Sequence, residues 1–524
     1  MNKKYCIVFA MILALLLSSC GAGTSTSDYS HASGAPAADS APSTAAPEEA
    51  TDIMEGEYFD GESYLVIDEN TETQVENESV LTFSLKVDTA AYTNVARYIE
   101  SGNLPPRDAV RTEEMINYFN YDADMSFTDG PFAIYTEIGA SPFDEAKHMA
   151  FVRVKTEEID KSELPSSNLT FLIDTSGSMN SYDKLPLLQE ALTLLVETLD
   201  EDDTVSIVTY AGSSAVVLDS VSGGKKSTIL NAINSLGAGG STAGAEGIVT
   251  AYALAEKNFM RGGNNRIILA SDGDFNVGIS NVEELKALIS EKRDSGVYLS
   301  VLGFGTGNIR DDIMETLAAN GNGNYSYINN TLTAQKVLVD ELGANLFTVA
   351  DDVKAQIEFN PENVKSYRLI GYENRMLNNR DFEDDTKDAG EIGMGTDVVL
   401  MFELELQNAD AGLKYGSGTQ ESRIGYGDEL FEVRIRYKDP GQSASKLILE
   451  PVTFESVLQV NSSDYQFACS VAAFGHLLRD SEYTGNATIE NVLTMAEGSL
   501  GRDTGGYRLA YLEMLKQYRN IINW

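Results

Sequence analysis

Short apolar runs alternate with longer amphipathic segments between residues 166 and 348. The apolar runs predict buried strands, and the segments with apolar residues at helical spacing predict helices. Such alternation indicates an α/β fold, in which a mostly parallel sheet carries helices on both faces. The predicted strands are Leu169–Ile173, Thr204–Tyr210, Arg266–Ala270 and Val297–Phe304, and the predicted helices are Leu185–Leu199, Thr228–Leu236, Ala243–Phe259, Val282–Arg293, Ile309–Ala319 and Thr333–Leu346.

Oxygen-bearing side chains gather at three boundaries of these elements. Asp174, Ser176 and Ser178 follow the first central strand, Thr242 stands in a glycine-rich stretch before a helix, and Asp272 follows the strand Arg266–Ala270. All three loops fall at the edge of the predicted sheet where α/β proteins bind ligands. Hard oxygen donors favour a divalent cation, with Mg²⁺ preferred here over Mn²⁺ or Ca²⁺, and the lack of thiols and imidazoles disfavours softer metals.

This set resembles the metal-ion-dependent adhesion site of von Willebrand factor type A (VWA) domains, which have a Rossmann-like fold. The resemblance implies that the two Asp-x-Ser-x-Ser hydroxyls and Thr242 contact the metal, while Asp174 and Asp272 act largely through bound water. Ser271 stands where threonine is common, and Ser241 leaves open which neighbouring hydroxyl reaches the metal. Four further residues are candidates for the rim of the site: Thr175, Ser241, Asp274 and Asn276, the last two being equally well explained as a solvent-exposed turn.

The resemblance extends over most of residues 80–520, to bacterial VWA lipoproteins with a short amino-terminal module and a characteristic carboxyl-terminal domain. It implies a module at 79–165, a VWA domain at 166–348 and a β-rich, then helical, domain at 349–524. The stretches that carry it are Val87–Tyr92, Leu104–Arg111, Glu113–Phe119, Ser271–Gly278, Gly321–Tyr325, Phe359–Pro361 and Tyr367–Arg375.

The regions on either side of the VWA segment contain runs of alternating polarity, which predict half-buried antiparallel strands. We expect residues 130–160 and 350–455 to combine into one β-sandwich-like module. Helical spacing then runs from Asp464 to Ile522, and the sequence leaves open whether these helices pack on those predicted at Thr89–Ser101 and Thr112–Phe119.

The first residues are typical of an exported, acylated protein. Two lysines precede an apolar run, and Leu17-Ser18-Ser19-Cys20 resembles the bacterial lipobox. We therefore expect a signal peptide at 1–19, a lipid on Cys20 and a flexible tether over 20–78, rich in Ser, Ala and Pro and then acidic. The chain would be anchored to the bacterial membrane through this lipid only, facing the extracytoplasmic side.

Charge and missing motifs narrow the function. A formal net charge of -42 argues against nucleic acid as a partner. Gly303-Phe304-Gly305-Thr306-Gly307 is better explained as a tight turn than as a nucleotide loop, and no signature of a hydrolase, metalloprotease or P-loop enzyme occurs. Cys469 lies in an apolar helical pattern typical of a buried, inert thiol.

These observations predict a non-catalytic binding module. A coordination position left to water could accept an Asp or Glu carboxylate from a partner protein, whose identity the sequence does not indicate. The alternative is an envelope scaffold or assembly factor in which the metal only stiffens the loops. The Asp174→Ala substitution and a chelator distinguish the binding module from the scaffold, because only the binding module requires the metal for partner capture.

Overall fold

The computed structural model describes residues 61–86, 88–127, 130–158, 164–241, 244–273, 282–293, 295–387, 389–407 and 427–523, except for the side chains of residues 282 and 284. The predicted signal peptide, Cys20 and the tether up to residue 60 lie outside this part of the chain. Residues 61–78, which the sequence analysis places in the tether, pack on the folded chain instead, because the apolar side chains of Tyr64, Ile67 and Val75 are buried.

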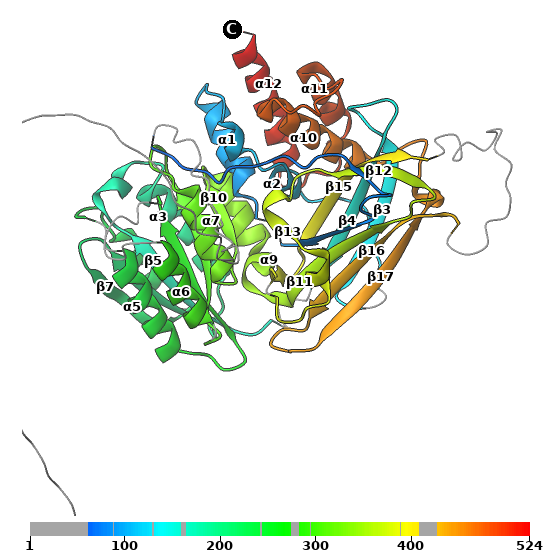
Figure 1. Cartoon of the computed structure of the whole chain (residues 1–524). Helices are drawn as coiled ribbons and strands as arrows, with labels where there is room; N and C mark the ends of the chain where they lie inside the picture. The colour runs from blue at the N-terminus through cyan, green and yellow to red at the C-terminus, as the bar shows by residue number, and fades with distance from the viewer. Residues whose placement is uncertain are drawn as a thin grey trace, which may run out of the picture. The chain divides into compact units, whose positions relative to one another are not determined.

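Six strands form the sheet predicted in the middle of the chain, in the order β10-β9-β8-β5-β6-β7 (Figure 1). All neighbours are parallel except β7, which runs antiparallel to β6 at one edge. Neither β7 nor β10 is predicted from the sequence, because β7 is largely exposed and β10 is short. The strands are β5 (Ser167–Asp174), β6 (Thr204–Tyr210), β7 (Ser214–Ser222), β8 (Asn264–Ser271), β9 (Tyr298–Phe304) and β10 (Tyr325–Ile328).

Helices cover both faces of this sheet, as predicted. Phe171 and Ile173 of β5 belong to one apolar cluster and Leu172 to another, because successive side chains of a strand point to opposite faces. The first cluster contains residues of α3 (Leu185–Thr198) and α4 (Lys226–Asn234). The second contains residues of α5 (Gly244–Lys257), α6 (Val282–Arg293) and α7 (Asp311–Asn320).

The last helical stretch of this region is interrupted, whereas the sequence predicts one helix over Thr333–Leu346. It consists of α8 (Thr331–Gln335), a π-helical turn (Lys336–Asp340) and α9 (Leu342–Leu346). The buried Lys336 lies within this turn, pairs with Glu341 and places its ammonium 5.0 Å from the centroid of the Tyr118 ring. The widened turn therefore coincides with a contact to a distant segment that a local pattern cannot show.

The flanking regions combine into a two-sheet module, which confirms the β-sandwich hypothesis. The two sheets share one apolar core, and β4 from before the VWA segment pairs with β15 from after it. One sheet has the order β1-β12-β15-β4-β3, and the other β13-β2-β11-β16-β17 with β14 beside β11. The strands are β1 (Thr73–Gln74), β2 (Val80–Ser84), β3 (Phe132–Ala140), β4 (His148–Thr156), β11 (Thr348–Phe359), β12 (Val364–Leu369), β13 (Met376–Leu377), β14 (Ile392–Gly393), β15 (Asp397–Leu406), β16 (Glu429–Lys438) and β17 (Ser445–Thr453).

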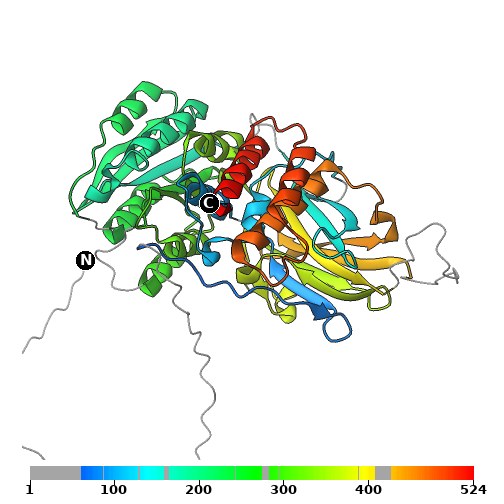
Figure 2. The same cartoon turned by 90° about the horizontal axis from the view of Figure 1, so that it is seen from above.

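The carboxyl-terminal helices pack on the amino-terminal ones, which answers the question that the sequence leaves open (Figure 2). The ring of Phe119 lies 4.8 Å from that of Phe467 and 5.5 Å from that of Tyr511. This helical layer comprises α1 (Ala90–Glu100), α2 (Thr112–Asn117), α10 (Ser463–Arg479), α11 (Ile489–Gly498) and α12 (Tyr507–Ile522). Within the described residues, no helix is both long and apolar enough to cross a membrane.

Buried ion pairs join the VWA region to the helical layer and the sandwich. Arg111 donates to Asp311 at the start of α7 at 2.6 Å and to Glu114 at 2.6 Å. Arg375 donates to Asp88 at 2.9 Å and to Glu315 of α7 at 3.0 Å. We call these six residues the α7 ion network.

Candidate functional site

The first predicted loop places its carboxylate at the base and its hydroxyls above it. Asp174 ends β5 and is fully buried, and its Oδ1 accepts a hydrogen bond from the Ser176 amide at 2.8 Å. The Ser176 and Ser178 hydroxyls are 3.0 Å apart, with Ser176 buried and Ser178 exposed. Two hydroxyl oxygens therefore lie together at the opening of a buried carboxylate.

Backbone hydrogen bonds join the second loop to the first. The Gly177 amide donates to the Gly240 carbonyl at 3.1 Å, and the Gly239 amide donates to the Thr175 carbonyl at 2.8 Å. Ser241 is exposed, and Thr175 is turned toward β6, where its hydroxyl donates to the Tyr210 carbonyl at 3.2 Å. Thr242 itself lies outside the described residues.

The third loop reaches the same point from β8. Ser271 ends β8, and its hydroxyl donates to Asp174 Oδ2 at 3.3 Å, while Asp272 follows it and is fully buried. Serine thus supplies here a hydrogen bond that links two of the loops. The predicted rim residues Asp274 and Asn276 lie outside the part of the chain that the structure describes.

Sequence reasoning missed one charged residue of this site. Lys184, directly before α3, donates to Asp272 Oδ2 at 2.8 Å and to Asn308 Oδ1 at 2.9 Å. Its side chain is buried. A lone lysine before a helix usually lies in solvent, so no local signal distinguishes this one.

The two carboxylates differ in their proton affinities. Burial raises the pKa of Asp174 to about 6, hydrogen bonds from Ser176 oppose the rise, and the charge of Asp272 adds to it. Burial also acts on Asp272, but the hydrogen bond and charge of Lys184 outweigh it and hold the pKa of Asp272 below its ordinary value. Among the described residues, the buried ammonium of Lys184 pairs with Asp272 and not with Asp174.

The donor chemistry fits a hard divalent cation. No group of three His, Cys, Asp or Glu side chains that could hold a metal occurs among the described residues, but the predicted ligand set contains only two carboxylates and relies on hydroxyls for the rest. Asp174 and Asp272 with Lys184 leave one net negative charge beside the Ser176 and Ser178 hydroxyls. The role of these residues as metal ligands stays a prediction.

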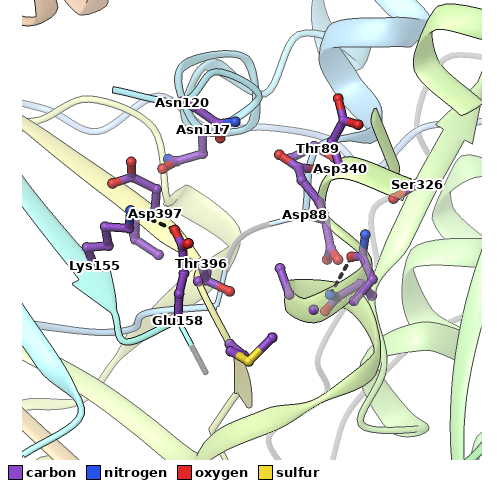
Figure 3. A pocket seen from close by; sticks show the side chains of 18 of the residues that line it. Asp88, Thr89, Asn117, Asn120, Lys155, Glu158, Ser326, Asp340, Thr396 and Asp397 are labelled. Carbon is purple, nitrogen blue, oxygen red and sulfur yellow. Dashed lines mark hydrogen bonds and ion pairs between the residues drawn. The ribbon is translucent and has the colours of Figure 1, made fainter. Parts of the chain in front are cut away.

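A separate cavity of about 450 Å³ lies where the VWA region, the helical layer and the sandwich meet. Figure 3 shows Lys155, Glu158 and Asp397 on one side and Asp88 and Asp340 on the other. Each of these charges already has a partner within the chain, such as Arg153 for Asp397. The Asp340 carboxylate accepts a hydrogen bond from the Tyr507 hydroxyl, and the other four charges each have a charged partner.

The predicted burial of the Cys469 thiol is confirmed. Cys469 is almost fully buried in α10, and burial raises the pKa of its thiol to about 12.

The Gly303–Gly307 segment forms the end of β9 and a turn in which Gly305 has a φ of +79°.

Comparison with known proteins defines the class first. Residues 168–341 match the von Willebrand factor type A domain, residues 58–151 match the model described as von Willebrand factor, and residues 344–521 match the carboxyl-terminal domain of the uncharacterized protein YfbK. This is a VWA-domain protein.

The particular family follows from a relative that aligns along most of the chain. The uncharacterized protein YfbK of Escherichia coli is 43% identical over 463 residues, which cover 86% of this chain and 80% of YfbK. The chain belongs to the YfbK family. An uncharacterized protein of Synechocystis is 30% identical over 190 residues, covering 36% of this chain and 44% of its own length.

Two solved structures overlap more loosely. A von Willebrand factor type A protein from Catenulispora acidiphila has a TM-score of 0.40 at 15% identity, covering 74% of this chain and 91% of its own. The ArnB paralog VWA2 from Sulfolobus acidocaldarius has a TM-score of 0.35 at 13% identity, covering 75% and 98% respectively. Overlaps this loose add nothing to the family assignment.

Proposed function

We propose that this VWA-domain protein is a non-catalytic, membrane-anchored binding module that captures an acidic group of a partner protein through a divalent cation, Mg²⁺ in the first instance. The cation would be held by Asp174, Ser176, Ser178, Thr242 and Asp272 and would supply a position for a carboxylate. Partner recognition is the general expectation for a VWA domain, and the cation and the anchor are the specific parts of the proposal.

One observation carries the proposal. The loops after β5 and β8 and the loop before α5 are tied together by the hydrogen bonds from Gly177 to Gly240 and from Ser271 to Asp174. They bring two buried carboxylates and two hydroxyls to one point, with Ser178 and Ser241 exposed above them. A cation at the base of such a site is reachable from solvent, as capture of a partner requires.

Charge supports an acidic ligand group only at this point. The chain is strongly acidic overall, with a formal net charge of -42, so most of its surface repels a carboxylate. Salt limits that repulsion to roughly 8 Å, and a bound divalent ion dominates the field closer in. Recognition of a carboxylate is thus confined to the cation.

The test is capture from the envelope fraction of the producing organism, run with Mg²⁺ and again with a chelator. We expect partner capture with Mg²⁺, loss of capture with the chelator, and the same loss for Asp174→Ala with little change in circular dichroism. The matched control is Asp219→Ala, an exposed aspartate of β7 in the same domain. Capture that survives both the chelator and Asp174→Ala favours the scaffold or assembly role instead.

The anchor requires a separate test, because it concerns residues outside the described part. We expect the full chain to partition with membranes and a Cys20→Ser variant to be released into the soluble extracytoplasmic fraction. Equal partitioning of the two chains would contradict anchoring through Cys20.

A further inference from the structure

Lys184 contributes a fixed positive charge to the predicted metal site. Its ammonium donates to Asp272 Oδ2 and to Asn308 Oδ1, and only 6% of the residue is exposed. The ion pair between Lys184 and Asp272 is buried, with side chains that are 7% and 0% exposed. The described part of the site therefore contains two carboxylates, Asp174 and Asp272, and the ammonium of Lys184.

The backbone around Lys184 is built to admit its side chain. Gly305 has a φ of +79°, and a Cβ placed there would lie 2.2 Å from Lys184 Cε and 2.3 Å from Cγ. The lysine stem thus runs against the backbone of the turn after β9, in space that any other residue at 305 would fill. Glycine at this position leaves room for the stem, and the hydrogen bonds to Asp272 and Asn308 hold the ammonium.

The charge balance has two consequences. Without Lys184, a divalent cation would neutralise Asp174 and Asp272 completely, and the loaded site would have no net charge. With Lys184, the loaded site keeps one positive charge, which a carboxylate from outside can neutralise. The ammonium of Lys184 also competes with the cation for Asp272. A positive charge close to a carboxylate lowers its affinity for a second cation, just as it lowers its affinity for a proton.

We propose that Lys184 is a positioning and specificity-determining residue that weakens the hold of the site on its cation and makes the loaded site selective for a partner carboxylate. This inference rests on the proposed function and deepens it. The charge of Lys184 explains how one site can select an acidic group although the chain as a whole is acidic.

The experiment measures metal and carboxylate affinity separately on the full chain in detergent. Isothermal titration gives the Mg²⁺ affinity, and water-proton relaxation of the Mn²⁺-loaded protein gives the affinity for acetate, the probe carboxylate. The variants are Lys184→Met, which keeps the length of the stem, and Lys184→Gln, which keeps a hydrogen-bond donor. Lys257→Met is the matched control, because Lys257 is an exposed lysine of the same domain and its loss changes the net charge equally.

We expect the two affinities to move in opposite directions. A neighbouring charge changes the proton affinity of a carboxylate by about tenfold or more, so Mg²⁺ should bind about tenfold more tightly to Lys184→Met. Acetate should bind the loaded variant about three- to fivefold more weakly, the scale of a partly exposed charge pair. Lys184→Gln should show the same pair of changes, and Lys257→Met neither.

Other results overturn the inference at distinct points. If Lys184 is purely structural, its replacement leaves the acetate affinity unchanged or lowers the affinities for Mg²⁺ and acetate together. That result overturns the role proposed for Lys184 and leaves the proposed function standing. If one variant fails to fold by circular dichroism, the other decides. A wild-type chain that binds neither Mg²⁺ nor Mn²⁺ overturns the proposed function, and this inference with it.

Discussion

Replacing Arg111 with methionine tests whether the α7 ion network joins the VWA region to the rest of the chain. Arg111 is 3% exposed in its side chain and contacts Asp311 and Glu114, each at 2.6 Å, and Glu315 at 4.0 Å. Methionine fills much of the same volume but leaves these carboxylates without their shared cation. The change therefore removes charge and hydrogen bonds with little change in packing.

The expected loss is that of one broken buried ion pair. Removing one partner of such a pair costs about 3–5 kcal/mol, because the other charge is left buried and uncompensated. Burial already raises the pKa of Glu114 to about 8, against the opposing charge of Arg111, so this carboxyl is largely protonated at neutral pH and adds little. Asp311, which is fully buried, carries the cost. Arg107→Met should cost less than about 1 kcal/mol, because the Arg107–Asp480 pair is exposed.

Two measurements together test this reasoning. Urea unfolding followed by far-ultraviolet circular dichroism gives the loss in stability, and hydrogen–deuterium exchange locates it. We expect faster exchange in α7 and α2 of Arg111→Met, with the sandwich strands β15 and β16 unchanged. The reasoning is refuted if Arg111→Met and Arg107→Met lose equal stability, or if exchange rises only outside α7 and α2.

Three further predictions concern single buried groups. The pKa of Glu114 is raised from 4.5 to about 8, so the folded chain holds this proton more tightly than the unfolded chain does. This contribution to stability is present below about pH 4.5 and is lost as pH rises from there through about 8. Glu114→Gln should flatten that fall in melting temperature. Burial, with the charges of Arg368 and Arg479, lowers the pKa of His476 well below 6.5, so stability falls as pH drops below about 6.5. His476→Phe should remove part of this fall. An unchanged dependence of the melting temperature on pH below about 6.5 would contradict the prediction. Cys469 should not react with a thiol reagent until the chain unfolds, as absorbance at a fixed reagent concentration would show; reaction in native buffer would mean that α10 opens locally.

Periodicity predicted the elements that bury a regular apolar pattern and failed elsewhere. The predicted strands Thr204–Tyr210 and Val297–Phe304 coincide with β6 and, to within one residue, with β9, because buried strands need continuous or alternating apolar residues. The edge strand β7 exposes Val216 and Val217, so its pattern does not differ from that of a loop. The break at Lys336 depends on Tyr118 and Tyr507, which are far away in sequence.

The site shows the same division. Asp174 and Asp272 could be predicted because both terminate buried strands, and strand ends of a parallel sheet meet at one edge. Lys184 could not be predicted, because its role arises from a backbone turn at Gly305 and a side chain at Asn308, more than a hundred residues along the chain. Motif reasoning finds side chains that share a local pattern, and it misses the charges that surround them.

The Asp272 loop of the predicted metal site and the α7 ion network meet at the start of α7. Arg310 precedes this helix, and a Cβ at Gly273 would lie 2.6 Å from the Arg310 amide nitrogen, so the third loop abuts this residue directly. The next residue, Asp311, is held by Arg111, and Arg310 itself donates to Ser63 at 2.8 Å. Contacts therefore run from the Asp272 loop through Arg310 and Asp311 to Arg111 of the helical layer, and from Arg310 to Ser63. Because packed elements shift between discrete arrangements rather than stretch, a change in the position of this loop requires Arg310 to repack.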